Sequence, residues 1–278
     1  MDLSRRVRPA GGWRYVPAVP LAIVFIAPLV LMLSGSLRET GLPPPTTVDL
    51  VPSPPAFENY AEAIDLAALS RASLNSLVVS GVAVPLSVVF GSWAGFAIAR
   101  LPRGRAKAVV IVSVVALMVP ATAMLVGRFA LFRLLGVTDT YVPLVAPALI
   151  GFSPLYVLLF AWAFKRLPAE LFDVARLEGL SPLGTWWRVG LPLVRTAALA
   201  VAGLVFVLSW NDFIGPLVYL SDQRLYTLPL ALRSLSTVPA PDAPLMLAGA
   251  VMATAPVVVV FVFVQRWLLG TALPGGRH

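Results

Sequence analysis

The stretch ASLNSLVVSGVAVPLSVVFGSWAGFAIA, residues 72–99, contains no Asp, Glu, Lys or Arg. A helix of about 20 residues crosses the roughly 30 Å of hydrocarbon in a bilayer, so this stretch is long enough for one passage. Inside lipid the backbone N–H and C=O groups must find partners within the segment, which an α-helix provides and a single strand does not. Residues 72–99 therefore predict a membrane-spanning α-helix.

Five further windows have the same character, and only one of them holds a charged residue, Asp212. The whole chain of 278 residues is 59% hydrophobic and 12% charged. A soluble domain carries roughly 25% charged residues, so a membrane protein is the expected class. We predict an all-α polytopic membrane protein, residues 1–278 forming one transmembrane domain. Its six predicted spans are 15–37, 72–99, 108–127, 140–164, 196–221 and 243–265.

Basic residues are distributed unevenly between the connecting segments. With a cytoplasmic N-terminus, segments 1–14, 100–107, 165–195 and 266–278 face the cytoplasm and hold 15 of the 21 Lys and Arg residues. Cytoplasmic loops of membrane proteins carry an excess of Lys and Arg, so we expect both termini in the cytoplasm. The net charge of +8 follows from these clusters, and no nucleic-acid partner is expected. The first apolar run lacks a clear small-residue cleavage site, so it is interpreted as an uncleaved helix.

Several kinds of chemistry lack their residues. The chain has no Cys, its one His is the terminal His278, and the patterns GxSxG, HExxH and GxxxxGK[ST] do not occur. We therefore expect no catalytic or metal site in the chain and no ATPase site of its own. A proton-coupled carrier usually keeps several acids or histidines in its spans, and this chain has only Asp212. A self-contained secondary carrier or channel for a small polar solute remains the alternative to a transport subunit, and a membrane enzyme or a structural scaffold is less favoured.

Residues 165–195, called the polar segment below, interrupt the apolar pattern. Pro168 is placed to begin a short helix, and Gly179 is placed to end it because glycine readily takes positive φ. Ser181-Pro182 then supplies an N-cap and a first helical residue, and Leu191-Pro192 is placed to end this second helix. The pattern predicts a helix–turn–helix at the cytoplasmic face. It is either a docking element for a cytoplasmic partner or an interfacial loop anchored by Trp186-Trp187 at headgroup depth.

The spacing within this segment favours docking. It reads Asp173-Val174-Ala175, then Gly179, then Val189, then Leu191-Pro192. This resembles the EAA loop of ABC-importer permeases, in which Glu-Ala-Ala is followed after three residues by Gly, after nine more by Ile, and one residue later by Leu-Pro. Asp here replaces the family's Glu, and valines replace its first Ala and its Ile. Asp keeps the charge on a shorter stem, and Val174 adds bulk to the helix.

The resemblance extends over nearly the whole chain and is to the carbohydrate-uptake branch, the maltose-type second permease. The final Gly-Ala-x-Lys-Gly pattern of that branch is replaced here by ALPGGRH. The motifs that carry the resemblance are NSLVVSG (75–81), FAIARLPRGRAK (96–107), MVPATAM (118–124), LPAELFDVARLEG (167–179), SWNDF (209–213), LYTLPLAL (225–232) and QRWLLG (265–270).

The resemblance implies a MetI-like ABC type I importer permease fold in a bacterial cytoplasmic (inner) membrane. It implies that this chain and a second homologous permease form the pathway for a sugar or polyol. Two copies of a cytoplasmic ABC ATPase would bind ATP and Mg, and an extracytoplasmic solute-binding protein would deliver the substrate. The chain itself would bind no cofactor.

By the same resemblance, the polar segment grips the ATPase, with a buried anchor made by Phe172, Ala175 and Leu177. In the pathway, Asn211 and Asp212 are costly in lipid and should face the bundle interior, and Trp210 offers a flat face and an N–H donor to a sugar ring. The alternative is that Asn211 and Asp212 only hydrogen-bond neighbouring helices. The expected ATPase-coupling residues are Asp173, Ala175, Arg176, Glu178, Gly179, Leu191 and Pro192.

Overall fold

The structure is a computed structural model that describes residues 18–41, 50–236 and 242–272. Within these ranges all regular secondary structure is helical, which confirms the predicted all-α class. The basic segment 1–14 and the terminal residues 273–278 lie outside the described residues. The chain forms two compact units, Met1–Ala67 with Leu235–Met252, and Ala68–Ser234 with Ala253–His278.

The first unit is tied together by Asn59, which is fully buried. Its side-chain amide donates hydrogen bonds to the carbonyl oxygens of Ser36 (2.8 Å) and Arg38 (2.7 Å). The last carbonyls of a helix have no intrahelical partner, so Asn59 satisfies the end of the first helix from a distance in sequence. The helices of this unit are α1 (Ala18–Ser36), α2 (Glu58–Leu66) and the first part of α14 (Ala243–Ala272).

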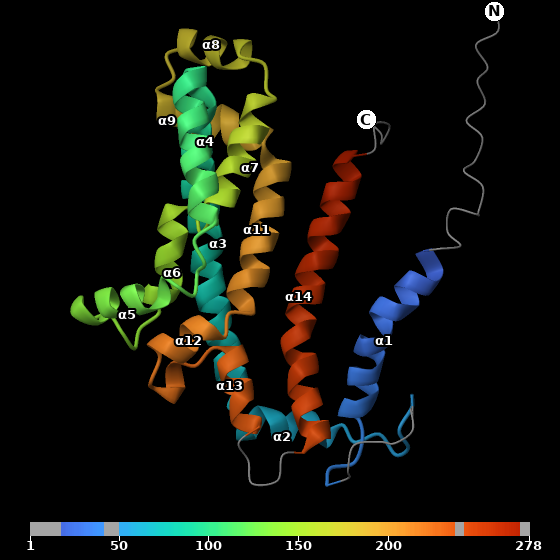
Figure 1. Ribbon diagram of the computed structural model, residues 1–278. Helices are drawn as coiled ribbons and strands as arrows, with labels where there is room; N and C mark the ends of the chain where they lie inside the picture. The colour runs from blue at the N-terminus through green and yellow to red at the C-terminus, as the bar shows by residue number, and fades with distance from the viewer. Residues whose placement is uncertain (1–17, 42–49, 237–241, 273–278) are drawn as a thin grey trace, which may run out of the picture. The chain divides into compact units, whose positions relative to one another are not determined.

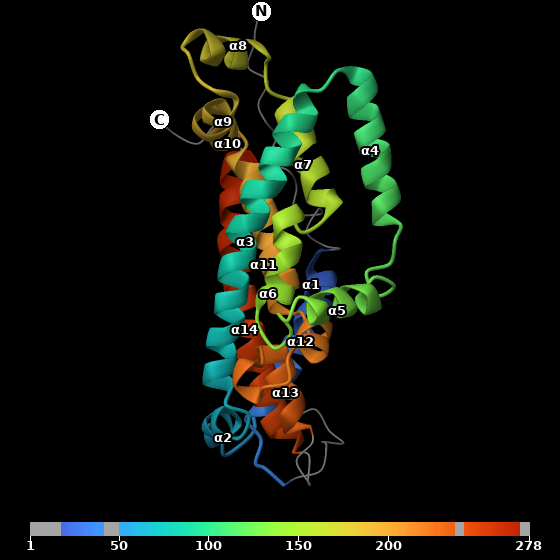
Figure 2. The same cartoon turned by 90° about the vertical axis from the view of Figure 1, so that its left-hand side faces the viewer.

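The second unit is built around the long helix α3, which packs against α7 and α11. Figure 2 shows α3 and α7 running side by side, and in both views α5 runs across their direction (Figures 1 and 2). Besides the rest of α14, the helices are α3 (Leu69–Arg100), α4 (Arg103–Leu117), α5 (Leu125–Leu134), α6 (Val142–Val145), η2 (Ala146–Ile150), α7 (Pro154–Lys165), α8 (Glu170–Leu177), α9 (Pro182–Thr185), η3 (Trp186–Gly190), α10 (Leu191–Leu193), α11 (Arg195–Trp210), α12 (Ile214–Tyr219), η4 (Gln223–Leu225) and α13 (Leu228–Leu235).

Two glycines one turn apart on α3 allow the close approach of α7. A Cβ on Gly95 would lie 2.5 Å from the Cβ of Phe160 and 2.9 Å from the carbonyl oxygen of Val157. One turn earlier, Gly91 lies under the same phenylalanine ring. Small residues spaced four apart are typical of helix contacts in membranes, because they let two backbones meet.

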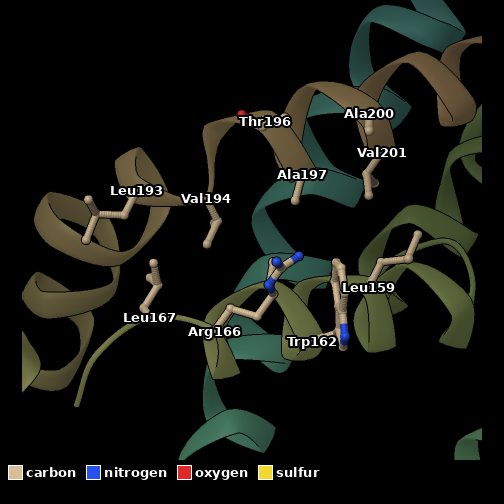
Figure 3. A pocket seen from close by; sticks show the side chains of 11 residues that line it. Leu159, Trp162, Arg166, Leu167, Leu193, Val194, Thr196, Ala197, Ala200 and Val201 are labelled. Atoms are coloured by element: carbon tan, nitrogen blue, oxygen red, sulfur yellow. The ribbon is translucent and has the colours of Figure 1, made fainter. Parts of the chain in front are cut away.

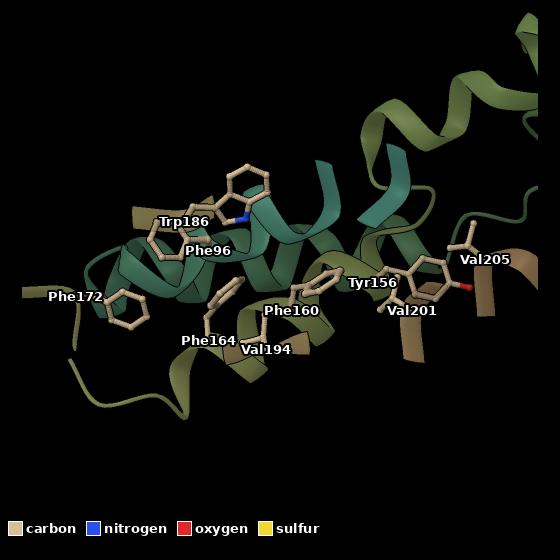
Figure 4. Packing of buried hydrophobic residues seen from close by; sticks show 9 residues of the cluster. All are labelled: Phe96, Tyr156, Phe160, Phe164, Phe172, Trp186, Val194, Val201 and Val205. Carbon is tan, nitrogen blue, oxygen red and sulfur yellow. The ribbon is translucent and has the colours of Figure 1, made fainter. Parts of the chain in front are cut away.

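A cluster of buried aromatic and aliphatic side chains extends from this contact to the polar segment (Figure 4). It joins α3, α7, α8, η3 and α11, so the polar segment and the long helices share one core. Its buried members are Phe96, Tyr156, Phe160, Phe164, Phe172, Trp186, Val194, Val201 and Val205.

The predicted spans are matched in part. In the described part of the chain, four helical runs are long and apolar enough to cross a membrane, and they are Val19–Ser36, Leu69–Arg100, Val142–Lys165 and Ala243–Trp267. The pair Pro182–Leu193 and Arg195–Trp210 qualifies as a fifth only if it is one span bent by 83°.

The window 108–127 is not a single helix, contrary to the prediction. The helix α4 begins earlier, at Arg103, and ends at Leu117 after 15 residues. At a rise of 1.5 Å per residue this is about 22 Å, which is shorter than the hydrocarbon layer. The chain turns before α5 begins at Leu125, and Pro120 lies in this turn, where its missing N–H does not interrupt a helix.

Candidate functional site

The first helix of the polar segment, α8, lies beyond the end of α3 and runs across its direction (Figures 1 and 2). Its inner face carries Phe172 and Ala175, which are both buried. The Phe172 ring meets the Phe96 ring edge-on at 5.7 Å between centroids, and the guanidinium carbon of Arg100 lies 3.9 Å from the Phe172 centroid. A hydrophobic contact and a cation–π contact therefore fix α8 to the end of α3.

The helix α8 ends in the way that the sequence predicts. Gly179 has a φ of +79°, in the left-handed region. Its N–H donates to the carbonyl of Arg176 at 2.9 Å, and the N–H of Leu180 donates to the carbonyl of Ala175 at 3.0 Å. These two bonds form a Schellman motif, which pairs the last carbonyls of the helix. The start is two residues later than predicted, at Glu170, so Pro168 lies outside the helix.

The second half of the segment begins as predicted and ends later. The Ser181 hydroxyl accepts a hydrogen bond from the N–H of Gly184 at 3.1 Å, which is an N-cap. The helical path then continues through η3 and α10 to Leu193, because Pro192 lies in the first turn of α10 and needs no donor there. The predicted end at Leu191-Pro192 is therefore wrong, and the break comes at Val194.

The two tryptophans of the segment have different environments. Trp186 is 4% exposed and its indole N–H donates to the hydroxyl of Ser92 on α3 at 3.2 Å. Trp187 is 56% exposed. The expectation that both side chains form an interfacial anchor is therefore wrong for Trp186, because its indole belongs to the core.

The exposed residues of α8 include the charged ones that were expected to couple. Asp173 and Arg176 are exposed and lie 3.9 Å apart at their closest charged atoms. An exposed pair of this kind contributes about 0–1 kcal/mol, so both side chains remain available to a partner. Glu178 is the exposed C-cap residue.

The buried anchor predicted from Phe172, Ala175 and Leu177 needs a correction. Phe172 and Ala175 are used within the chain, whereas Leu177 is 87% exposed. Leu171 and Val174 are also exposed and lie six and three residues before Leu177. Their spacing of three places them together on the side of α8 away from Phe172, a periodicity that is present in the sequence but was not part of the predicted anchor.

A pocket of about 350 Å³ lies between α7 and α11 (Figure 3). Its walls are mostly apolar. The guanidinium carbon of Arg166 lies 4.6 Å from the ring centroid of Trp162, and both side chains line the pocket. The stacking holds this cationic group beside the last turn of α7.

The predicted pathway residues lie where α11 ends. Trp210 is buried, stacks on Phe206 at 5.5 Å, and donates its indole N–H to the carbonyl of Ala253 on α14 at 2.9 Å. Both features that were expected to serve a sugar, the ring face and the N–H, are therefore used within the chain in this conformation.

Asn211 and Asp212 form a break between α11 and α12. Asn211 is exposed, and its amide donates to the carbonyl of Val207 at 2.8 Å. The carboxylate of Asp212 accepts from the N–H of Gly215, in the first turn of α12, at 3.0 Å. Both hydrogen bonds go to the local backbone.

The motif NSLVVSG has a structural role at the other end of α3. The amide of Asn75 donates to the carbonyls of Arg224 and Tyr226, both at 2.9 Å, and the hydroxyl of Ser76 accepts from the N–H of Leu228 at 2.8 Å. The motif thereby fastens the LYTLPLAL segment. Beside it, hydrogen bonds from Arg224 lower the pKa of Asp222.

The helices, their close glycine-mediated contact and the docked amphipathic helix define a multi-pass integral membrane subunit. Residues 87–269 match the family described as "Binding-protein-dependent transport system inner membrane component", and the chain belongs to this family of transporter permeases.

Named relatives agree with this assignment. The chain is 30% identical over 279 residues to the "Arabinooligosaccharides transport system permease protein AraQ" of Halalkalibacterium halodurans, covering 99% of each chain. It is 26% identical to the "Melibiose/raffinose/stachyose import permease protein MelC" of Bacillus subtilis, covering 91% of each. A solved bacterial ABC transporter "involved in the import of the acidic polysaccharide alginate" has a chain with a TM-score of 0.76 at 22% identity, covering 92% of this chain and 96% of that one. The fold is that of a MetI-like ABC-importer permease.

Proposed function

We propose that this chain is one of two permease subunits of an ABC importer and forms half of the pathway for a sugar or related polyol. The observation that carries the proposal is α8, which packs on the core through Phe172 while Leu171, Val174 and Leu177 stay exposed. A second homologous permease, two copies of an ABC ATPase and an extracytoplasmic solute-binding protein complete the assembly. The ATPase copies bind ATP and Mg, and this chain supplies no ATPase site.

The proposed topology has six spans with both termini in the cytoplasm of a bacterium, in its inner membrane. The positive-inside distribution of Lys and Arg supports it. In this topology α4, with the turn after it, and the bent pair of α9–α10 with α11 account for the two spans that are not single long helices. The polar segment then faces the cytoplasmic ATPase.

The mechanism follows from how α8 is attached. Closure of the ATPase dimer on ATP displaces α8 through Leu171, Val174 and Leu177, while Asp173, Arg176 and Glu178 set its register by charge. The contact of Phe172 with Arg100 transmits the displacement to α3. The chain path from Gly179 through η3 to Leu191 and Pro192 transmits it to α11, because packed helices move as bodies.

The substrate pathway is proposed to pass the break between α11 and α12. Asn211 and Asp212 interrupt the helical path between α11 and α12. Inside a membrane such a break leaves backbone groups that need water or protein partners, and a break of this kind is tolerated beside a water-filled cavity. Trp210 is proposed to stabilise this break through the hydrogen bond from its indole N–H to the carbonyl of Ala253 on α14. The substrate is proposed to be an oligosaccharide, because the relatives' names state arabinooligosaccharides and the melibiose group.

The experiment that tests the proposal is uptake and ATP hydrolysis by the assembled transporter in proteoliposomes. Asp173→Arg reverses a charge on the outer face of α8 and should abolish uptake while the assembly still inserts. Asp65→Arg makes the same change on the exposed surface of α2 and should leave uptake unchanged. If both variants take up substrate normally, the coupling role is wrong. Uptake by the chain without ATP would instead support a self-contained carrier.

A further inference from the structure

A pocket of about 450 Å³ lies where α3 meets the polar segment. Four residues of α3 line it at spacings of three and four, from Trp93 through Phe96 to Arg100, so they share one face of that helix. Arg176 of α8 and Thr185 of α9 line the opposite side, together with Leu180 of the connecting turn and Pro182 of α9. The pocket therefore combines an apolar, aromatic wall with two guanidinium groups and a hydroxyl.

Two of these polar groups are buried without a partner. The Nη2 atom of Arg100 and the hydroxyl of Thr185 have no hydrogen-bond partner within the described part of the chain. Thr185 is 3% exposed. Buried polar groups of folded proteins are nearly always paired, so these two groups are open to ordered water or to the oxygen atoms of a ligand.

The stacking of Arg100 leaves its N–H groups free for such a ligand. Its guanidinium carbon lies 4.7 Å from the Phe96 centroid and 3.9 Å from the Phe172 centroid. These contacts use the flat face of the guanidinium, whereas hydrogen bonds leave from its edge. The two rings therefore orient the guanidinium group of Arg100 and use none of its N–H donors.

The pocket carries a positive charge. Arg176 and Arg100 both line it, and the acid that acts on both, Asp173, is exposed and 3.9 Å from Arg176. A solvated carboxylate at this distance neutralises little of the charge. The donors available are guanidinium N–H groups and a hydroxyl, which is the set that binds oxyanions.

The position of the pocket on α3 selects the source of the oxyanion. Arg100 is the last residue of a helix of 32 residues that is long enough to cross a membrane, and Trp93 lies two turns before it. Tryptophans and arginines at such a helix end lie at the level of lipid headgroups. Basic pockets between helices at this level suit anionic headgroups, and an apolar wall suits the glycerol and acyl parts.

We propose that this pocket binds the phosphate of an anionic phospholipid through Arg100, Arg176 and Thr185, with the rest of the lipid along Trp93 and Phe96. These three polar residues belong to α3, α8 and α9. A bound phosphate therefore bridges the end of α3 to both helices of the polar segment and braces α8 in its docked position. The site shares Arg176 with the coupling surface proposed above, and lipid retention by the chain alone tests it separately from transport.

The test is lipid retention by the purified full chain, measured by native mass spectrometry with phosphatidylglycerol, phosphatidylcholine and inorganic phosphate as probes. The wild type retains phosphatidylglycerol in preference to phosphatidylcholine. Arg176→Gln and Thr185→Val each weaken this retention, by about tenfold for the arginine, since a charge-assisted hydrogen bond is lost. Thr185→Ser keeps the hydroxyl and retains the lipid.

Arg105→Gln is the matched control, because it removes the same charge from an exposed position near the end of α3 but outside the pocket. It leaves retention of phosphatidylglycerol unchanged. Equal retention by wild type, Arg176→Gln and Thr185→Val overturns the proposal. So does equal retention of phosphatidylcholine, or displacement of the lipid by inorganic phosphate, which would show that the site takes the free anion.

Discussion

Gly95 lies at the closest approach of α3 and α7, and one added methyl group tests whether this contact holds the second unit together. A Cβ at this position would lie 2.5 Å from the Cβ of Phe160, 2.8 Å from the N of Ala161 and 2.9 Å from the carbonyl oxygen of Val157. Carbon atoms pack about 3.5–4.0 Å apart, so the helices would have to separate by about 1 Å. The obstructing atoms are backbone or Cβ atoms and cannot rotate away. We expect Gly95→Ala to lower the free energy of unfolding by about 3 kcal/mol.

The assay is thermal unfolding of the purified full chain in detergent. A loss of this size should lower the melting temperature on the order of 6–12 °C. Two controls lie on the same helix. Gly91→Ala places its Cβ at ordinary distances of 3.6–3.7 Å, and Gly81→Ala places it in open space. An alanine in a helix is favoured over glycine by about 0.5–1 kcal/mol, so Gly81→Ala should not destabilise. If Gly95→Ala melts at the same temperature as Gly81→Ala, the packing argument is refuted.

Two further predictions concern α8. Phe172→Ala should release α8 from the core at a cost of about 3–5 kcal/mol, seen as faster amide hydrogen exchange in α8, while Leu177→Ala should leave exchange unchanged because that side chain is exposed. Equal protection in both variants would contradict the assigned orientation. Gly179→Ala should destabilise by about 1 kcal/mol or more because φ is +79°, and Gly179→Asn should cost less, as compared by thermal unfolding. Equal losses in the two variants would show that the left-handed backbone is not the cause.

Much of the predicted structure of the polar segment depended on single residues and their immediate neighbours. The end of α8 at Gly179 and the cap at Ser181 were visible in the sequence, because each depends on a residue and its immediate neighbours. The end of the second helix was not, since Pro192 is compatible with either stopping a helix or opening its next turn. The same ambiguity explains Pro168, which lies just before α8 and not at its start.

Long-range contacts account for the errors at the candidate site. Trp186 and Trp187 are neighbours with the same side chain, but only Trp186 packs in the core against α3, where its indole N–H bonds to Ser92. The sequence predicts that Trp210 contacts a sugar ring, but its indole N–H donates instead to the carbonyl of Ala253. No local pattern specifies these pairings.

The helical, membrane-spanning character of the chain follows from its residues alone, because long runs without charge leave the backbone no other way to pair its polar groups in lipid. The sequence also located the polar segment and its turn at Gly179. The buried face of α8, the stacking of Arg100 and the bond of Asn75 to a residue 149 positions away become visible only in the folded chain. These contacts depend on the packing of helices that are remote in sequence. The spacing of residues along one helix does not indicate which helix packs against it.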